Sequence, residues 1–319
     1  MVCKLFLPSE EAERYLDQGD EHMTVTDWKD PDQVAEEVIR CALIEDRALE
    51  DAATGALGNN GLTMASCDVN ARENLVVAGI PFAAKAFHML SDRVSVEILT
   101  EEGQKVPSGT TLAVIYGRVS DILRGERIFL NLLGRMCGIA TLTSEYVSLV
   151  RKYGTEILDT RKTTPCLRGL EKYSVKAGGG VNHRFSLADM AMIKDNHIAA
   201  AGGVENLGPV MNRLKSQGIP VEIEVDSLSQ LRVVLPLAPH RILLDNMDTD
   251  TLREAVKISG DSGVYLEASG GINLKTVAAV AATGVNGISS GALTHSAESS
   301  DIGMDWSYHG GENNGQACF

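Results

Sequence analysis

The sequence predicts an α/β protein in two parts, an N-terminal α+β region followed by a parallel α/β barrel of about seven strands. Residues 25 to 125 mix helical patterns with short strand-like runs, which is an α+β pattern. After Gly154, short apolar strands alternate with amphipathic helices, as a parallel sheet requires because crossovers join its neighbouring strands. Polar residues follow most of these strands, as they do at the rim of a barrel. A doubly wound open sheet would also collect them along one edge and is the alternative fold.

The N-terminal region is predicted to begin with a helix over residues 31 to 49, where apolar residues recur at helical spacing. Three strand-like runs follow, separated by turns that supply Gly and Pro. These runs are residues 73 to 80, 93 to 99 and 111 to 119. A helical run from residue 121 to 154 leads out of the region and is expected to form one or two helices, broken near Gly138.

The barrel region is predicted to hold seven strands, each a short apolar run bounded by helical or turn sequences. The candidate strands are residues 156–159, 175–178, 190–195, 221–226, 241–245, 264–269 and 286–290. Seven parallel strands fit a closed or nearly closed barrel. The loops after the strands are then expected to converge over the barrel axis, where active sites of this fold class form.

Composition excludes some classes of partner. The chain has 319 residues, a formal net charge of −14 and a pI near 5.0, so it repels phosphate backbones and no nucleic-acid partner is expected. No apolar run approaches the roughly 20 residues that cross a bilayer, and the N-terminus lacks the apolar core of a signal peptide. We therefore expect a cytoplasmic protein. The cysteines are far apart with no C-x-x-C pair, so free thiols are expected.

A group of cations interrupts this acidic background. Residues 158 to 197 hold seven Lys or Arg against four Asp or Glu, and clustered like charges repel one another unless an anion binds them. The cations predicted to face the rim are Arg161, Lys162, His183, Arg184 and Lys194. Arginine binds carboxylates through two parallel hydrogen bonds, so Arg161 and Arg184 predict a ligand with more than one carboxylate. Lys194 alone is ambiguous, because a lysine at a barrel strand end can also form a Schiff base.

Three further cations in the same window are interpreted differently. Arg168, Lys172 and Lys176 lie along a helical segment and are expected to face solvent.

Two segments rich in Gly and Ser follow the last two predicted strands. Such residues just before a helix leave backbone N–H groups pointing outward, which suits a phosphate, and barrels commonly seat a phosphate at this place. The phosphate candidates are Ser269, Gly270, Gly271, Ser290 and Gly291. The alternative is that these glycines only tighten the turns between strand and helix.

Two acidic residues end neighbouring predicted strands. Glu224 and Asp245 offer hard oxygen atoms, which suit a magnesium ion or the hydroxyl groups of a ribose. Asp226 directly precedes a helical run and is equally well explained as a helix cap.

The ordered series of motifs in this chain resembles the quinolinate phosphoribosyltransferase family over residues 33 to 306. The motifs that carry the resemblance are LDTRKTTPCLRGLEKYSVKAGGGVNHRFSLADMAMIKDNH, VEIEVDS, LLDNM, EASGGI and SSGALTHS. The resemblance implies an N-terminal open α/β sandwich domain over residues 1–129, joined by the C-terminal segment 298–319, and an incomplete barrel over residues 130–297. It also implies a homodimer in which the sandwich of one subunit covers the barrel of the other, with a hexamer left open.

The activity implied by the resemblance is the joining of quinolinate to phosphoribosyl pyrophosphate with Mg²⁺, giving nicotinate mononucleotide, pyrophosphate and CO₂. Arg127 would reach quinolinate across the dimer interface. The residues implied to line the same site with it are Arg161, Lys162, His183, Arg184 and Lys194. Those implied near the phosphates are Ser269, Gly270, Gly291 and His295. Glu224 and Asp245 would face the ribose and the metal, and Lys162, Lys194, Glu224 and Asp245 would be the catalytic residues.

Some positions depart from the family pattern. Cys166 stands where the family usually has glycine, and the first 23 residues and the last dozen have no clear counterpart. Residues 300 to 307 are expected to return to the N-terminal domain as an extra strand. The rival hypotheses are a Schiff-base aldolase built on Lys194, a pyrophosphorylase-like protein associated with molybdate transport, and a form that binds a phosphorylated ligand without catalysis.

Overall fold

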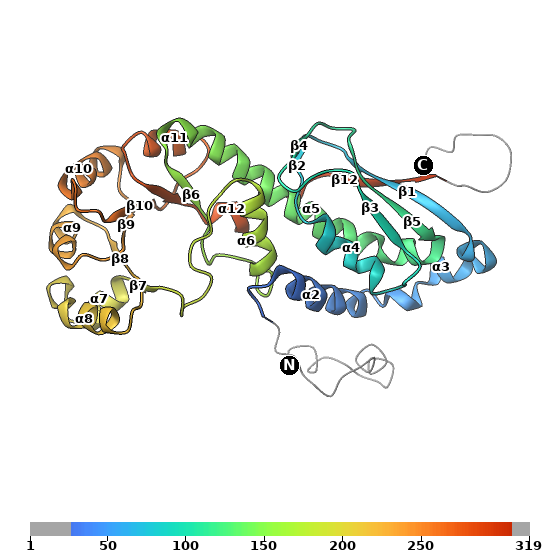
Figure 1. Ribbon diagram of the computed structural model, residues 1–319, viewed down its shortest axis with the longest axis horizontal. Helices are drawn as coiled ribbons and strands as arrows, with labels where there is room; N and C mark the ends of the chain where they lie inside the picture. The colour runs from blue at the N-terminus through green and yellow to red at the C-terminus, as the bar shows by residue number, and fades with distance from the viewer. Residues whose placement is uncertain (1–26, 308–319) are drawn as a thin grey trace. The chain divides into compact units, whose positions relative to one another are not determined.

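The computed structural model describes residues 27 to 307, so the expectations about the first 23 residues and the last dozen lie outside the described residues. The described chain forms two compact units (Figure 1). The first comprises residues 27–138 and 299–307, and the second comprises residues 139–298. The division falls inside the helix α5 (Val119–Val150), which also contains the predicted limit at residue 129.

The first unit is an α+β domain built on an antiparallel sheet in the strand order β12-β1-β5-β3. Its sheet strands are β1 (Met64–Ala71), β3 (Ser95–Ile98), β5 (Thr111–Arg118) and β12 (Ile302–Ser307). A separate pair consists of β2 (Leu75–Val76) and β4 (Lys105–Val106). The helical elements before α5 are α2 (Pro31–Glu45), η2 (Ala48–Glu50), α3 (Ala52–Ala56), η3 (Gly58–Leu62) and α4 (Ile80–His88).

Helix α2 begins where the sequence gives a clear start signal. Asp30 accepts a hydrogen bond from the backbone N–H of Asp32, and Pro31 occupies the first turn, where its missing N–H costs nothing. Helix α2 packs against α4. Helix α4 in turn meets α5 through Phe87 and Phe129, whose ring centroids are 5.0 Å apart.

Two expectations for the first unit can be compared with the structure, which also contains a strand that was not expected. Residues 300–307 were expected to add a strand, and β12 confirms this by pairing antiparallel with β1. Strand β1 itself, at the centre of the sheet, was missed. The predicted break near Gly138 is wrong, because α5 is one continuous helix. A helical glycine costs about 1 kcal/mol, which burial of neighbours such as Leu133 and Ile139 outweighs.

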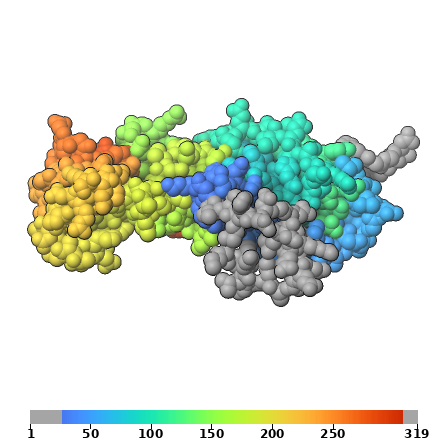
Figure 2. Space-filling model, turned by 60° about the horizontal axis from the view of Figure 1, so that its bottom comes forward, coloured from blue at the N-terminus to red at the C-terminus, as the bar shows by residue number. Residues whose placement is uncertain are grey.

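The second unit contains a sheet of six parallel strands in the order β6-β11-β10-β9-β8-β7 (Figure 1). The strands are β6 (Glu156–Leu158), β7 (Ala191–Ile193), β8 (Val221–Val225), β9 (Arg241–Asp245), β10 (Tyr265–Ser269) and β11 (Gly287–Ser289). The α-helices that follow these strands are α6 (Arg168–Ala177), α7 (Asp195–Ala200), α8 (Gly208–Ser216), α9 (Leu228–Val234), α10 (Thr249–Ser259), α11 (Val277–Ala281) and α12 (Ala292–His295). The 3₁₀ turns are η4 (Arg151–Tyr153), η5 (Val204–Asn206) and η6 (Leu235–Leu237). In space-filling view, the yellow and orange residues of α7 to α10 form a continuous outer surface (Figure 2).

The expected seventh strand at residues 175–178 is wrong, because these residues end α6 and enter the turn after it. Val175 is fully buried in the core beneath the helix, so a short apolar run was mistaken for a strand. The chain turns at Gly179, whose φ of +87° favours glycine. Val181 then makes an isolated parallel bridge to Leu158. The edge strands β6 and β7 are not paired with each other, so the barrel is incomplete.

Side chains of the barrel strands alternate between the helices outside and the barrel interior. On β8, Val221, Ile223 and Val225 belong to the apolar core that the helices cover. Glu222 and Glu224, between them, therefore point to the interior. The same alternation aims polar residues of β9 and β10 inward, and this alternation supplies the site described below.

Among residues 27 to 307, no helix is both long and apolar enough to span a membrane. Cys41, Cys67, Cys137 and Cys166 are free thiols, as expected. Cys3 and Cys318 lie outside the described residues.

Candidate active site

A cavity of about 760 Å³ opens at the carboxyl ends of the parallel strands, and second-unit residues alone line it. Every predicted substrate-binding residue of this unit lies in its wall. These residues are Arg161, Lys162, His183, Arg184, Lys194, Glu224, Asp245, Ser269, Gly270, Gly271, Ser290, Gly291 and His295. Arg127, on α5 in the first unit, is not among the lining residues. Residues separated by more than a hundred positions in the sequence thus share one cavity.

Two arginines give the cavity a cationic wall. The Arg184 guanidinium donates to the backbone oxygen of Met190 at 2.9 Å. Burial and the nearby positive charge of Arg161 both lower the pKa of Arg184. The buried Nε of Arg161 has no hydrogen-bond partner within the described chain. Two guanidinium groups this close to one another are suited to an anion that lies between them.

A buried ion pair supports this wall from beneath. The ammonium group of Lys172 pairs with Asp159 and donates to the backbone oxygen of His183 at 3.1 Å. The same carboxylate accepts the backbone N–H of His183 at 2.8 Å. His183 is therefore held at both its backbone groups.

The expectation that Lys172 faces solvent is wrong, because its side chain is only 2% exposed. Helix α6 turns this side toward the end of the barrel, where Asp159 compensates the buried charge. Arg168 is half-buried and donates to the backbone oxygen of Phe185 at 3.1 Å, so it is also not a free surface cation. Only Lys176 is exposed as expected.

The opposite side of the cavity carries acidic groups. Lys194 Nζ lies 2.5 Å from Glu224 Oε2. Asp245 accepts a hydrogen bond from its neighbour Asn246 at 2.8 Å. Glu224 and Asp245 come from the adjacent strands β8 and β9 and both line the cavity. Carboxylate oxygens on neighbouring strands are the donors that Mg²⁺ prefers when substrate phosphates supply the remaining ligands, so this pair fits a magnesium ion.

Glycine-containing loops close the third side. A Cβ on Gly270 would lie 2.1 Å from Asn246 Oδ1, and a Cβ on Gly291 would lie 2.7 Å from Lys162 Cδ and 3.0 Å from His295 Nε2. Gly270 needs glycine, because its Cβ would also meet the backbone nitrogen of Asn246 at 2.9 Å, whereas at Gly291 a Cβ would displace the side chains of Lys162 and His295. At Gly291 the backbone lies close to the side chains of Lys162 and His295. Lys162 adds positive charge to this part of the cavity wall.

The expected placement of the phosphate candidates directly before a helix is found for one loop and not for the other. Ser290 and Gly291 directly precede α12. Ser269, Gly270 and Gly271 are followed by a loop, since α11 begins only at Val277. Gly270 and Gly271 instead adopt left-handed backbone angles, with φ of +96° and +62°, which glycine tolerates without strain.

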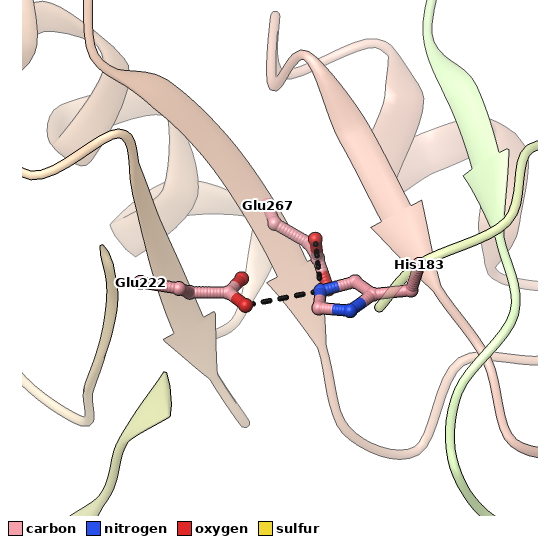
Figure 3. Close-up of side chains that lie close together, drawn as sticks. All are labelled: His183, Glu222 and Glu267. Carbon is pink, nitrogen blue, oxygen red and sulfur yellow. Dashed lines mark ion pairs between the residues drawn. The ribbon is translucent and has the colours of Figure 1, made fainter. Parts of the chain in front are cut away.

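One part of the site was missed from the sequence. Glu222 is completely buried, and with His183 and Glu267 it forms a compact cluster in the barrel interior (Figure 3). His183 Nε2 lies 3.0 Å from Glu222 Oε2 and 3.3 Å from Glu267 Oε2. A signal was present, because in the segment VEIEV both glutamates occupy the face opposite the apolar residues.

The fold and this cavity define a barrel protein that gathers cations, carboxylates and glycine loops at the strand ends to bind an anionic ligand. Two family models match the chain: the quinolinate phosphoribosyl transferase N-terminal domain over residues 51–137 and the C-terminal domain over residues 139–305. The chain belongs to the quinolinate phosphoribosyl transferase family.

Named relatives agree with this assignment. The chain is 41% identical over 276 residues to the nicotinate-nucleotide pyrophosphorylase [carboxylating] of Mycobacterium leprae, covering 85% of this chain and 96% of that protein. It is 40% identical over 260 residues to the probable enzyme of the same name from Bacillus subtilis, covering 81% and 90%. The solved structure of the nicotinate-nucleotide pyrophosphorylase from Francisella tularensis superposes with a TM-score of 0.83 at 33% identity, covering 89% of this chain and 100% of that one.

Proposed function

We propose that this protein transfers the phosphoribosyl group of phosphoribosyl pyrophosphate to quinolinate, with loss of CO₂, to give nicotinate mononucleotide and pyrophosphate in de novo NAD biosynthesis. The observation that carries the proposal is the shared cavity. Its cationic wall, its two acidic strand ends and its glycine loops lie together in a chain of this family. The reaction needs a binding site for a dicarboxylate, referred to below as the quinolinate seat, beside a binding site for a sugar with phosphates, the phosphate seat.

Quinolinate is assigned to the cationic wall. Arg161 and Arg184 offer planar guanidinium groups that match carboxylates, and His183 and Lys194 add two further cationic or donor groups. In the proposed homodimer, Arg127 of the partner subunit would complete this seat. The homodimer, a hexamer built from it and the cytoplasmic location stay predictions.

Phosphoribosyl pyrophosphate is assigned to the acidic and glycine-rich sides. Glu224 and Asp245 would hold Mg²⁺, which supplies charge neutralisation for the pyrophosphate oxygens. The residues assigned to the phosphates are Lys162, Ser269, Gly270, Gly271, Ser290, Gly291 and His295.

The protein groups explain the order of bond changes. As the bond between C1 of the ribose and the pyrophosphate oxygen loosens, Lys162 stabilises the charge that develops on the leaving group. The pyridine nitrogen of quinolinate then bonds to C1 and becomes positively charged. The adjacent ring carbon can hold the electron pair left by CO₂, so no side chain has to abstract a proton, and that carbon afterwards takes up a proton.

The family assignment weighs against the aldolase hypothesis, because both family models that match the chain are those of a quinolinate phosphoribosyl transferase.

The proposal is tested by incubating the purified protein with quinolinate, phosphoribosyl pyrophosphate and Mg²⁺. We expect nicotinate mononucleotide, identified by mass, together with an equal amount of pyrophosphate. Omission of either substrate should abolish both products. A protein that binds both substrates but forms no nucleotide would overturn the proposal.

A further inference from the structure

The cluster of His183, Glu222 and Glu267 lies inside the barrel, and His183 and Glu267 also form part of the cavity wall. Glu222 comes from β8 and Glu267 from β10, while His183 reaches toward both from the segment that follows the bridge at Val181 (Figure 3). The three side chains are 5%, 0% and 1% exposed in the order His183, Glu222 and Glu267. Three ionisable groups are thus removed from water at a place where barrels usually have branched apolar side chains.

The position of the hydrogen on the imidazole follows from its neighbours. The backbone N–H of Arg184 points at Nδ1 of His183 at 2.8 Å, so in the neutral ring Nδ1 carries the lone pair and Nε2 carries the hydrogen. In the cationic ring Nδ1 would also carry a hydrogen, which would oppose the N–H of Arg184, so the observed contact is that of the neutral ring. Nε2 then carries the hydrogen near the two carboxylates and is not available as a metal ligand.

The charges around the ring balance without an additional ion. Arg241 lies 3.3 Å from Glu267 and pairs with its negative charge. Burial raises the pKa of Glu222, which favours its uncharged form beside the neutral ring. A buried polar group costs stability unless a partner compensates it, so Glu222 and Glu267 need His183 as much as they hold it.

His183 directly precedes Arg184, which lines the cavity. The backbone of His183 is fixed by Asp159 and Lys172, but these contacts leave its ring free to rotate. Only Glu222 and Glu267 among the described side chains meet Nε2 within ion-pair distance. The ring in turn lies against the backbone of Arg184, whose guanidinium lines the cavity.

We propose that Glu222 and Glu267 are positioning residues, whose contacts with Nε2 of His183 fix the imidazole beside Arg184 for binding of the dicarboxylate substrate. The proposal rests on the proposed function. In this assignment neither glutamate touches the anion. Each affects anion binding through His183. Their removal should act on the quinolinate seat and leave the phosphate seat unchanged.

Steady-state kinetics of Glu222→Gln and Glu267→Gln test this assignment. We expect the KM for quinolinate to rise about tenfold in each variant, since a small displacement of binding groups weakens productive geometry. The KM for phosphoribosyl pyrophosphate should stay within about twofold. Glu156→Gln is the matched control. Glu156 accepts a hydrogen bond from the Tyr265 hydroxyl at 2.6 Å at the amino end of the same barrel. The substitution therefore removes a carboxylate without changing a contact of His183.

Each outcome decides the proposal. Equal rises in both KM values would reduce Glu222 and Glu267 to structural residues. A stoichiometric metal ion found by elemental analysis in the wild type and lost in both Gln variants would assign the cluster to a cation and overturn the proposal. Nitrogen-15 spectra of labelled histidine should show Nε2 of His183 protonated at pH 7 and pH 10, even for a variant too unstable for kinetics. Failure of the proposed function is distinct, because then the wild type itself would form no nucleotide.

Discussion

The two sheets of this protein place their charged residues in opposite ways. In the first unit, β1 directs Ala65, Cys67 and Val69 into the core, while Asp305 of β12 pairs with Arg72 at the surface, where both side chains are about half exposed. In the second unit, Glu222 and Glu267 point into the barrel and are completely buried. Surface charges can be explained by solubility alone, whereas buried charges cost stability unless they are paired. The position of a charge, more than its presence, therefore marks the functional region.

The largest expected difference between the two regions concerns stability. Lys172→Ala should lower the free energy of unfolding by about 3–5 kcal/mol, because it leaves Asp159 buried without its partner. Arg72→Ala, which breaks the surface pair with Asp305, should cost about 1 kcal/mol or less. Urea unfolding of the two variants measures the comparison. Similar losses would show that the interior pair has no special role.

Substrate choice should show the next largest effect. Nicotinate lacks the second carboxylate of quinolinate, so one arginine of the seat, Arg184 or Arg127, would lose its partner. The cost is roughly 2 to 5 kcal/mol, and kcat/KM for nicotinate should be lower by a corresponding factor. Comparable efficiency with the two acids would refute the dicarboxylate seat.

Lys162, a cation at the rim of the barrel, should affect the reaction rate and not the stability of the fold. Lys162→Ala is expected to lower kcat by about 10²-fold, as removal of a group that stabilises developing charge does, with the free energy of unfolding little changed. Lys105→Ala, at an exposed position on β4 of the first unit, is the control and should leave kcat unchanged. If Lys162→Ala keeps more than about a third of the activity, the leaving group is not stabilised there.

Magnesium should couple to the acidic strand ends. Chelation of divalent ions should abolish turnover, and Asp245→Asn should raise the Mg²⁺ concentration needed for half-maximal rate by about tenfold. An unchanged Mg²⁺ dependence in Asp245→Asn would place the ion elsewhere.

The smallest effect is expected at Cys166, which has a left-handed backbone with φ of +65°. Cys166→Gly relieves strain of about 1–2 kcal/mol but gives the unfolded chain more freedom, about 0.4–1 kcal/mol. The free energy of unfolding should therefore change by less than about 1.5 kcal/mol, and turnover should stay within a few-fold. A hundredfold change in turnover would show that this loop takes part in the reaction.

The sequence predicted the site well where charged residues stand at the ends of short apolar strands. Arg161, Lys194, Glu224 and Asp245 follow short apolar strands, and the parallel arrangement brings all of them to one cavity. Cys166 has a positive φ, which agrees with the glycine that the resemblance led us to expect at this position.

Elsewhere, local sequence patterns led to predictions that were wrong or missing. Lys172 looks like a surface residue of a helix, and only the fold reveals Asp159 beneath it. Glu222 looks like one more charge in an acidic protein, because its partners His183 and Glu267 are distant in sequence. Strand β1 was missed since Asp68 and Asn70 interrupt its apolar pattern, and α5 continues through Gly138 because long-range packing outweighs a local cost.

Release of labelled CO₂ tests the central claim most directly. With quinolinate labelled in the carboxyl group next to the ring nitrogen, CO₂ should appear only when phosphoribosyl pyrophosphate is present, in an amount equal to the nicotinate mononucleotide formed. CO₂ released without the sugar donor, or a nucleotide that keeps both carboxyl groups, would contradict a single cavity that joins the substrates and then decarboxylates the product.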